Sequence, residues 1–191
     1  GIGIQNGKTP ENLGVLWRSA QNLGATFIFT IGNRYAKQAC DTHDAVKAIP
    51  YFQKGLEQKK ELLLYKPFVY ALLLENLGYS RFKANESNGL PDLFYESLKL
   101  RDSLQLTTGV IVSQLHLSEY FASKGEKAKS LQYSKQALQT ARNSKNNRNV
   151  LAPLKQLAII EPQKAVEYNK EYIHINDSLQ KAERKIAEKF S

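Results

Sequence analysis

The 191-residue chain contains no methionine, a single cysteine, a single tryptophan and three histidines. Because Cys40 stands alone, an intrachain disulfide is excluded, and its simplest role is that of a small buried apolar side chain. His43, His116 and His174 lie far apart in sequence and show no metal-ligand spacing, so we expect no metal site. No apolar run reaches the ~20 residues of a membrane-spanning helix, so we expect no membrane segment in this chain.

The charge of the chain is unbalanced but not concentrated. It carries 27 Lys or Arg residues against 18 Asp or Glu residues, for a net charge of +9. Acids interrupt the basic residues, as in the stretch GEKAKSLQYSKQ, which is typical of solvated helical faces. A diffuse affinity for RNA or another anionic surface is the alternative interpretation.

The first fifty residues have the pattern of an α/β protein. The apolar run GIGIQ ends at the turn dipeptide Asn6-Gly7. The stretch TPENLGVLWRSAQNLG then offers Thr9 as a helix N-cap, Pro10 at the first helical position and Gly24 at the helix end. The following stretch, ATFIFTIG, is β-branched and aromatic and predicts a buried strand. The sequence therefore predicts a short N-terminal β-α-β unit with parallel strands.

Within this unit, Asn12, Gly14 and Arg18 form the pattern Asn-x-Gly-x-x-x-Arg. Residues 1–52 thereby resemble the N-terminal part of SpoU-type RNA 2′-O-methyltransferases, whose first motif has this pattern. The resemblance implies that Arg18 lies near the target ribose and helps to activate its 2′-hydroxyl, and that Asn12 shapes the loop or contacts RNA. The alternative is that both side chains only cap and solvate a helix.

The rest of the methyltransferase pattern is missing. In the SpoU family the S-adenosylmethionine site lies in a C-terminal knot that two later motifs build. After residue 52 the sequence has neither the Gly-rich, Glu-containing strand and loop nor the helix start with Asn and Ser. We therefore expect no cofactor and no methyl transfer by this chain alone. An S-adenosylmethionine-dependent methyltransferase, with RNA as its partner, is the alternative function.

After residue 52 the hydrophobic period becomes helical and a motif recurs. Segments 89–100, 127–138 and 162–173 align with one another, and segments 71–82 and 113–125 precede two of them. They resemble the tetratricopeptide repeat, in which helix pairs stack because one pair cannot bury its apolar face alone. A four-helix bundle and an unrelated helical domain are the alternatives. We predict a mainly α fold, a tetratricopeptide-like helical repeat array with a short N-terminal β-α-β unit.

Residues 48–191 also resemble the repeat domain of bacterial membrane-anchored regulators, in stretches such as LLLENLGYSRFK and DLFYESLKLRDSLQL. The resemblance implies a protein- or peptide-binding scaffold in a signalling regulator, located in the periplasm; the methyltransferase resemblance implies the cytoplasm. A purely structural array is a further alternative. The groove would be lined by first-helix residues that do not form a clamp for a peptide carboxylate. These residues are Glu75, Tyr79, Leu115 and Glu119.

The two patterns meet in the stretch KAIPYFQKGL, residues 47–56. It fits the second helix of a repeat, with Tyr51, Phe52 and Leu56 in register, but it also continues the β-α-β unit. We therefore divide the chain into residues 1–47 and residues 48–191. We interpret the overlap as a junction of two unrelated sequences, with a natural two-domain protein as the alternative. Incomplete halves would leave apolar surface exposed, which favours a homodimer.

Overall fold

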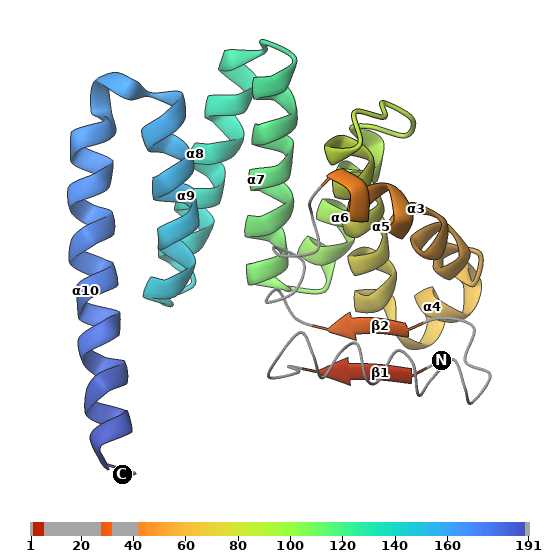
Figure 1. Cartoon of the computed structure of the whole chain (residues 1–191), viewed down its shortest axis with the longest axis horizontal. Helices are drawn as coiled ribbons and strands as arrows, with labels where there is room; N and C mark the ends of the chain where they lie inside the picture. Colours follow the sequence, from red (N-terminus) through yellow and green to blue (C-terminus); the bar gives the residue numbers. More distant parts are fainter. Residues whose placement is uncertain (1, 6–27, 32–41, 190–191) are drawn as a thin grey trace.

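A computed structural model describes residues 2–5, 28–31 and 42–189 of the chain. In this part the fold is mainly α, as the sequence predicted. Two short strands are followed by a series of helices (Figure 1). The elements are β1 (Ile2–Gln5), β2 (Ile28–Ile31), α3 (Thr42–Leu56), α4 (Lys59–Tyr65), α5 (Pro67–Lys83), α6 (Asp92–Ser103), α7 (Thr107–Ser123), α8 (Lys127–Asn143), α9 (Asn147–Ile160), the 3-10 turn η1 (Pro162–Lys164) and α10 (Ala165–Lys189).

The two strands pair in parallel, with Ile2 opposite Ile28 and Gln5 opposite Ile31. Parallel strands need a crossover connection between them. The connecting residues 6–27, which hold Asn12 and Arg18, lie outside the described residues, so the helix of the predicted β-α-β unit remains a prediction.

The helices from α5 onward form successive antiparallel pairs. α5 packs on α6, α7 on α8, and α9 on α10. The first helices of the pairs also contact one another, α5 with α7 and α7 with α9. In Figure 1 the pairs follow one another across the molecule, and the lower part of α10 extends beyond α9. None of the helices among the described residues is sufficiently long and apolar to cross a membrane.

Four helices end in the same way, each with a residue in the left-handed conformation. Helices α5, α6, α7 and α8 are each followed, two residues after their last helical position, by a residue with φ between 55° and 75°. At three of these ends the next N–H donates to the carbonyl five residues earlier, at 2.9 Å, as in a Schellman motif. The left-handed residues are spaced 20 apart: Asn85, Gln105, Gly125 and Lys145.

Small side chains allow the paired helices to cross closely. Between α5 and α6, the buried hydroxyl of Ser97 donates to the carbonyl of Ala71 at 2.9 Å. Between α7 and α8, the hydroxyls of Ser118 and Ser134 are 2.7 Å apart. Each hydrogen bond satisfies a polar group that would otherwise be buried without a partner. The crossings are therefore close without leaving these polar groups unsatisfied.

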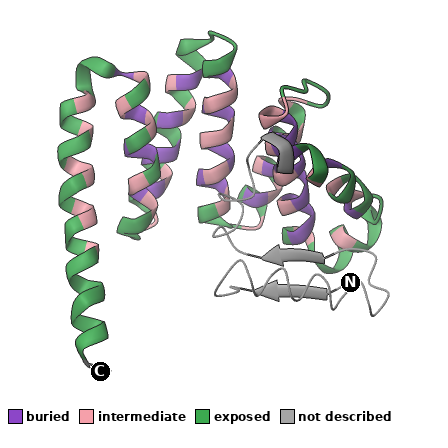
Figure 2. Ribbon diagram, in the orientation of Figure 1, coloured by how far each residue is buried: buried purple, intermediate pink, exposed green. Residues whose placement is uncertain are grey.

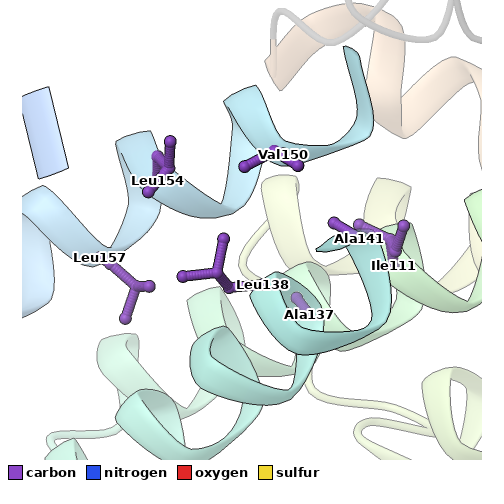
Figure 3. Close-up of a cluster of buried hydrophobic side chains, with 7 residues drawn as sticks. All are labelled: Ile111, Ala137, Leu138, Ala141, Val150, Leu154 and Leu157. Carbon is purple, nitrogen blue, oxygen red and sulfur yellow. The ribbon is translucent and has the colours of Figure 1, made fainter. Parts of the chain in front are cut away.

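The core continues from one pair to the next. Phe94 of α6 is fully buried with Leu117 and Phe121 of α7, and a Cβ on Gly78 would lie 2.8 Å from the Phe94 ring. Figure 2 shows buried residues on the facing sides of the helices and mostly exposed ones along α10. A second cluster joins α7, α8 and α9 (Figure 3): Ile111, Ala137, Leu138, Ala141, Val150, Leu154 and Leu157.

Helix α3 joins the array as one continuous helix, and the predicted boundary after Lys47 lies inside it. Ala45 and Ile49 are buried, and a Cβ on Gly55 would lie 3.1 Å from the Leu73 side chain of α5. Tyr51, which the repeat register marked as apolar, is 47% exposed. The contact between α3 and α5 therefore rests on small and aliphatic residues.

The left-handed residues at the helix ends predict that two substitutions change the stability of the fold in opposite directions. Gln105→Gly should stabilise the fold by about 1 kcal/mol, because a left-handed conformation is costly for a residue with a Cβ. Gly125→Ala should destabilise it by about the same amount, although no atom lies within 4 Å of the added methyl group. Urea unfolding of the two variants measures both changes. A Gln105→Gly variant less stable than the wild type would contradict the conformational explanation.

Candidate functional site

The most polar part of the interior is a carboxylate held among three helices. The Glu75 side chain of α5 is 1% exposed. Its Oε2 lies 3.2 Å from Nη1 of Arg101 on α6 and accepts a hydrogen bond from the Ser113 hydroxyl on α7. Its Oε1 lies 2.7 Å from Nδ1 of His116, also on α7. Because an ionised carboxylate only accepts hydrogen bonds, Nδ1 of His116 carries the hydrogen.

The arginine that faces this carboxylate is itself fixed by α7. Nη1 of Arg101 donates to the carbonyl of Gly109 at 2.8 Å and to the Ser113 hydroxyl at 3.1 Å. A Cβ on Gly109 would lie 2.9 Å from Cδ of Arg101, so a larger residue would displace the arginine. The guanidinium therefore has both a counter-charge and a backbone acceptor, as a buried cation requires.

Burial and hydrogen bonding act in opposite directions on Glu75. Burial raises the pKa of its carboxyl, but the hydrogen bond and charge of His116, the charge of Arg101 and the Ser113 hydroxyl together outweigh burial. The pKa of Glu75 therefore lies below its ordinary value of 4.5. For Arg101, burial lowers the pKa, and the charge of Glu75 opposes that effect. The cluster is thus an ion pair at neutral pH.

The arrangement favours a structural role over a nucleophilic one. In a serine hydrolase the hydroxyl donates to an imidazole, which removes its proton. Here the Ser113 hydroxyl donates to the Glu75 carboxylate instead. That carboxylate also accepts from His116 and forms an ion pair with Arg101. Among residues 42–189 no three His, Cys, Asp or Glu side chains are grouped as metal ligands. What this geometry can do is hold α5, α6 and α7 together.

An aromatic surface covers the cluster. The His116 ring stacks on Tyr79, with centroids 4.1 Å apart and planes 17° apart. From there the rings continue along the ends of α5 and α7, with Phe82 6.3 Å from Tyr120. The ammonium of Lys83 lies 5.1 Å from the Tyr79 ring centroid. Contacts between aromatic rings, and between a cation and a ring face, stabilise a cluster of this kind in addition to the burial of its apolar area.

The structure brings only part of the predicted groove set together. Glu75 and Tyr79 meet at His116, but Glu75 is buried and has no open surface. Leu115 is half-buried and packs against the apolar cluster of α7, α8 and α9. Glu119 is half-buried on α7, one turn beyond Leu115. Whether Tyr79, Leu115 and Glu119 line a ligand groove remains a prediction.

Sequence reasoning missed three members of the buried cluster: Arg101, Ser113 and His116. In the sequence, His116 stands out only as one of three widely separated histidines without metal-ligand spacing. A usable signal existed, because Ser113 and His116 are three residues apart and so face the same neighbour on a helix. That neighbour, Glu75, lies 38 residues before Ser113, and no local pattern connects the two.

Breaking the buried pair should cost far more stability than breaking an exposed one. Glu75→Gln leaves the Arg101 charge buried without its partner, so we expect a loss of about 3–5 kcal/mol in unfolding free energy. The control is Glu183→Gln, which removes the exposed pair with Arg148 and should cost at most about 1 kcal/mol. Urea unfolding at pH 7 compares the two variants. Equal losses would show that the buried pair contributes no more than a surface contact.

The pH dependence of stability should change in the same variant. Because the folded-state pKa of Glu75 lies below its ordinary value of 4.5, the unfolded chain binds more protons in acid. The stabilisation by Glu75 is complete above that ordinary value and is lost as the pH falls toward the folded-state pKa. The stability gap between wild type and Glu75→Gln should therefore narrow as the pH falls through and below 4.5. A gap that stays constant over this range in urea titrations would contradict the lowered pKa.

No family model matches the chain, and neither does any curated protein or solved structure.

Proposed function

We propose that the helical array is a protein- or peptide-binding scaffold, the sensing or interaction part of a bacterial signalling regulator. The proposal rests on the resemblance of residues 48–191 to tetratricopeptide repeats and needs no cofactor. Arrays of this kind stack helix pairs and present an extended surface to a ligand.

One observation carries the proposal: the first helices repeat in register. Helices α5, α7 and α9 begin at Pro67, Thr107 and Asn147, at a constant spacing of 40 residues. They also contact one another in that order. Residues 40 apart therefore occupy equivalent positions along one face of the array, which an extended ligand can follow.

The equivalent positions extend the predicted groove to the third pair. Tyr79, Glu119 and Ile159 form one such row, and Leu115 and Lys155 belong to another. Ile159 is 73% exposed. The row therefore offers aromatic, acidic and aliphatic contacts in turn, and Ile159 is the member most accessible to a ligand.

A matched pair of isoleucines tests the proposal. Peptides are first selected on the wild-type chain from a random displayed library, and their affinities are then measured by calorimetry. Ile159→Arg should weaken the selected peptides at least about tenfold, or ~1.4 kcal/mol, because it places a charge on the ligand face. Ile173→Arg, on the second helix of the same pair, replaces a side chain that is also exposed, at 57%. It should leave affinity unchanged.

Two results would refute the proposal. One is a selection that enriches no peptide on the wild-type chain. The other is an equal loss of affinity in the two isoleucine variants, which would place the ligand away from the first-helix face. Circular dichroism confirms beforehand that both variants keep the helical content of the wild type.

A further inference from the structure

Helix α6 departs from the 20-residue period of the helices around it. Helices α7, α8 and α9 each begin two residues after a left-handed residue, at Thr107, Lys127 and Asn147. By the same spacing α6 would begin at Ser87, but it begins at Asp92. Figure 1 shows the connection after α5 as a wide loop, whereas the later connections are tight. The first turn or more of α6 is thus replaced by residues 87–91.

The sequence of this loop explains why it is not helical. Gly89 has φ of 72°, outside the right-handed helical region. Pro91 restricts the residue before it and disfavours a helical conformation for Leu90. The loop therefore departs from the helix for reasons local to its own residues, and the opening it leaves is a built feature of the chain.

The loop is held in place from both sides. On α5, Nη1 of the buried Arg81 donates to the carbonyl of Asn88 at 3.0 Å. Within the loop, the N–H of Leu90 donates to the carbonyl of Ser87 at 3.0 Å. The Leu90 side chain packs against the aromatic cluster around Phe94. These contacts hold the loop in a fixed position, where it forms one wall of the space that the shortened helix leaves.

That space is a hollow of about 430 Å³ between the loop and the ends of α5 and α7. Its apolar walls are Phe82 of α5, Leu90 of the loop and Tyr120 of α7. Its volume falls within the range of about 300–1,000 Å³ that is usual for ligand sites in proteins. It is therefore large enough for one bulky side chain of a partner.

The rim of the hollow is positively charged on balance. Lys83 and Lys124 line it, against a single carboxylate, Glu86. The Lys124 ammonium lies 5.6 Å from the centroid of the Tyr120 ring, so this cation lies next to an apolar wall of the hollow. The net charge of +9 on the whole chain adds a general attraction for anionic partners.

We propose that this hollow is a peptide subsite that receives one large apolar side chain, aromatic or aliphatic, from an acidic segment of a partner protein. The apolar walls take the anchoring side chain, and the two lysines pair with carboxylates beside it. The subsite lies at the α5 end of the array and rests on the proposed scaffold function, for which it supplies the class of partner.

Three labelled five-residue peptides test the chemistry by fluorescence anisotropy. In the first, tryptophan is flanked by two glutamates on each side; in the second, alanine replaces the tryptophan; in the third, lysines replace the glutamates. The first should bind saturably, and the other two should bind at least about tenfold more weakly, or ~1.4 kcal/mol. No saturation by about 1 mM, or equal binding of the lysine peptide, would overturn the proposal.

Matched serines locate the binding. Ser123 lines the hollow, and Ser103 is the last residue of α6, at the opposite end of that helix from the loop. Each hydroxyl donates to the carbonyl three residues earlier, at 2.7 and 2.8 Å. Ser123→Trp should fill the hollow and weaken the first peptide at least tenfold, while Ser103→Trp should not. Lys124→Gln should weaken it severalfold, and Lys127→Gln, outside the hollow, should not. Equal effects within either pair would overturn the assignment.

The experiments on the peptide subsite and those on the scaffold can fail independently of each other. Failure of the three peptides, with the Ile159→Arg effect intact, would remove the subsite and leave the scaffold. Failure of the Ile159→Arg effect, with the serine pair behaving as expected, would leave a peptide site confined to this hollow.

Discussion

The buried Glu75 carboxylate is the contact on which the joining of the first two helix pairs depends. Glu75 belongs to α5, forms an ion pair with Arg101 of α6 and accepts hydrogen bonds from Ser113 and His116 of α7. It therefore joins three helices at one point. In a stacked array each pair contacts only its neighbours, so stability passes along the chain pair by pair. Loss of this contact would weaken the packing of α5 on α6 and α7.

The same joint carries the surface that faces a ligand. His116 contacts Glu75 through Nδ1 and Tyr79 through its ring face, so the hydrogen bond to Glu75 fixes the orientation of the aromatic surface. Rigid aromatic groups bind with little loss of conformational freedom, which is why they serve as anchors in interfaces. The interior electrostatics and the exterior binding chemistry of the α5–α7 region are therefore linked through one imidazole.

Regular repetition and the shortened start of α6 have different consequences. The left-handed residues at 20-residue spacing place successive helices side by side, and this gives the array a repeating face. The shortened start of α6 breaks that regularity and opens a hollow next to Phe82 and Tyr120. Specific sites in regular scaffolds commonly lie in such irregular connections, which an ordered framework positions.

The sequence by itself determined the elements that depend on near neighbours. The helical period after residue 52 could be predicted because a helix is closed by contacts four residues apart. Tertiary structure alone decided that Glu75 is buried. Its sequence position marked it as a groove residue, but Arg101, Ser113 and His116 lie 26 to 41 residues away. Whether a charge is tolerable in the interior depends on partners brought close by folding, since desolvation must be offset by them in space.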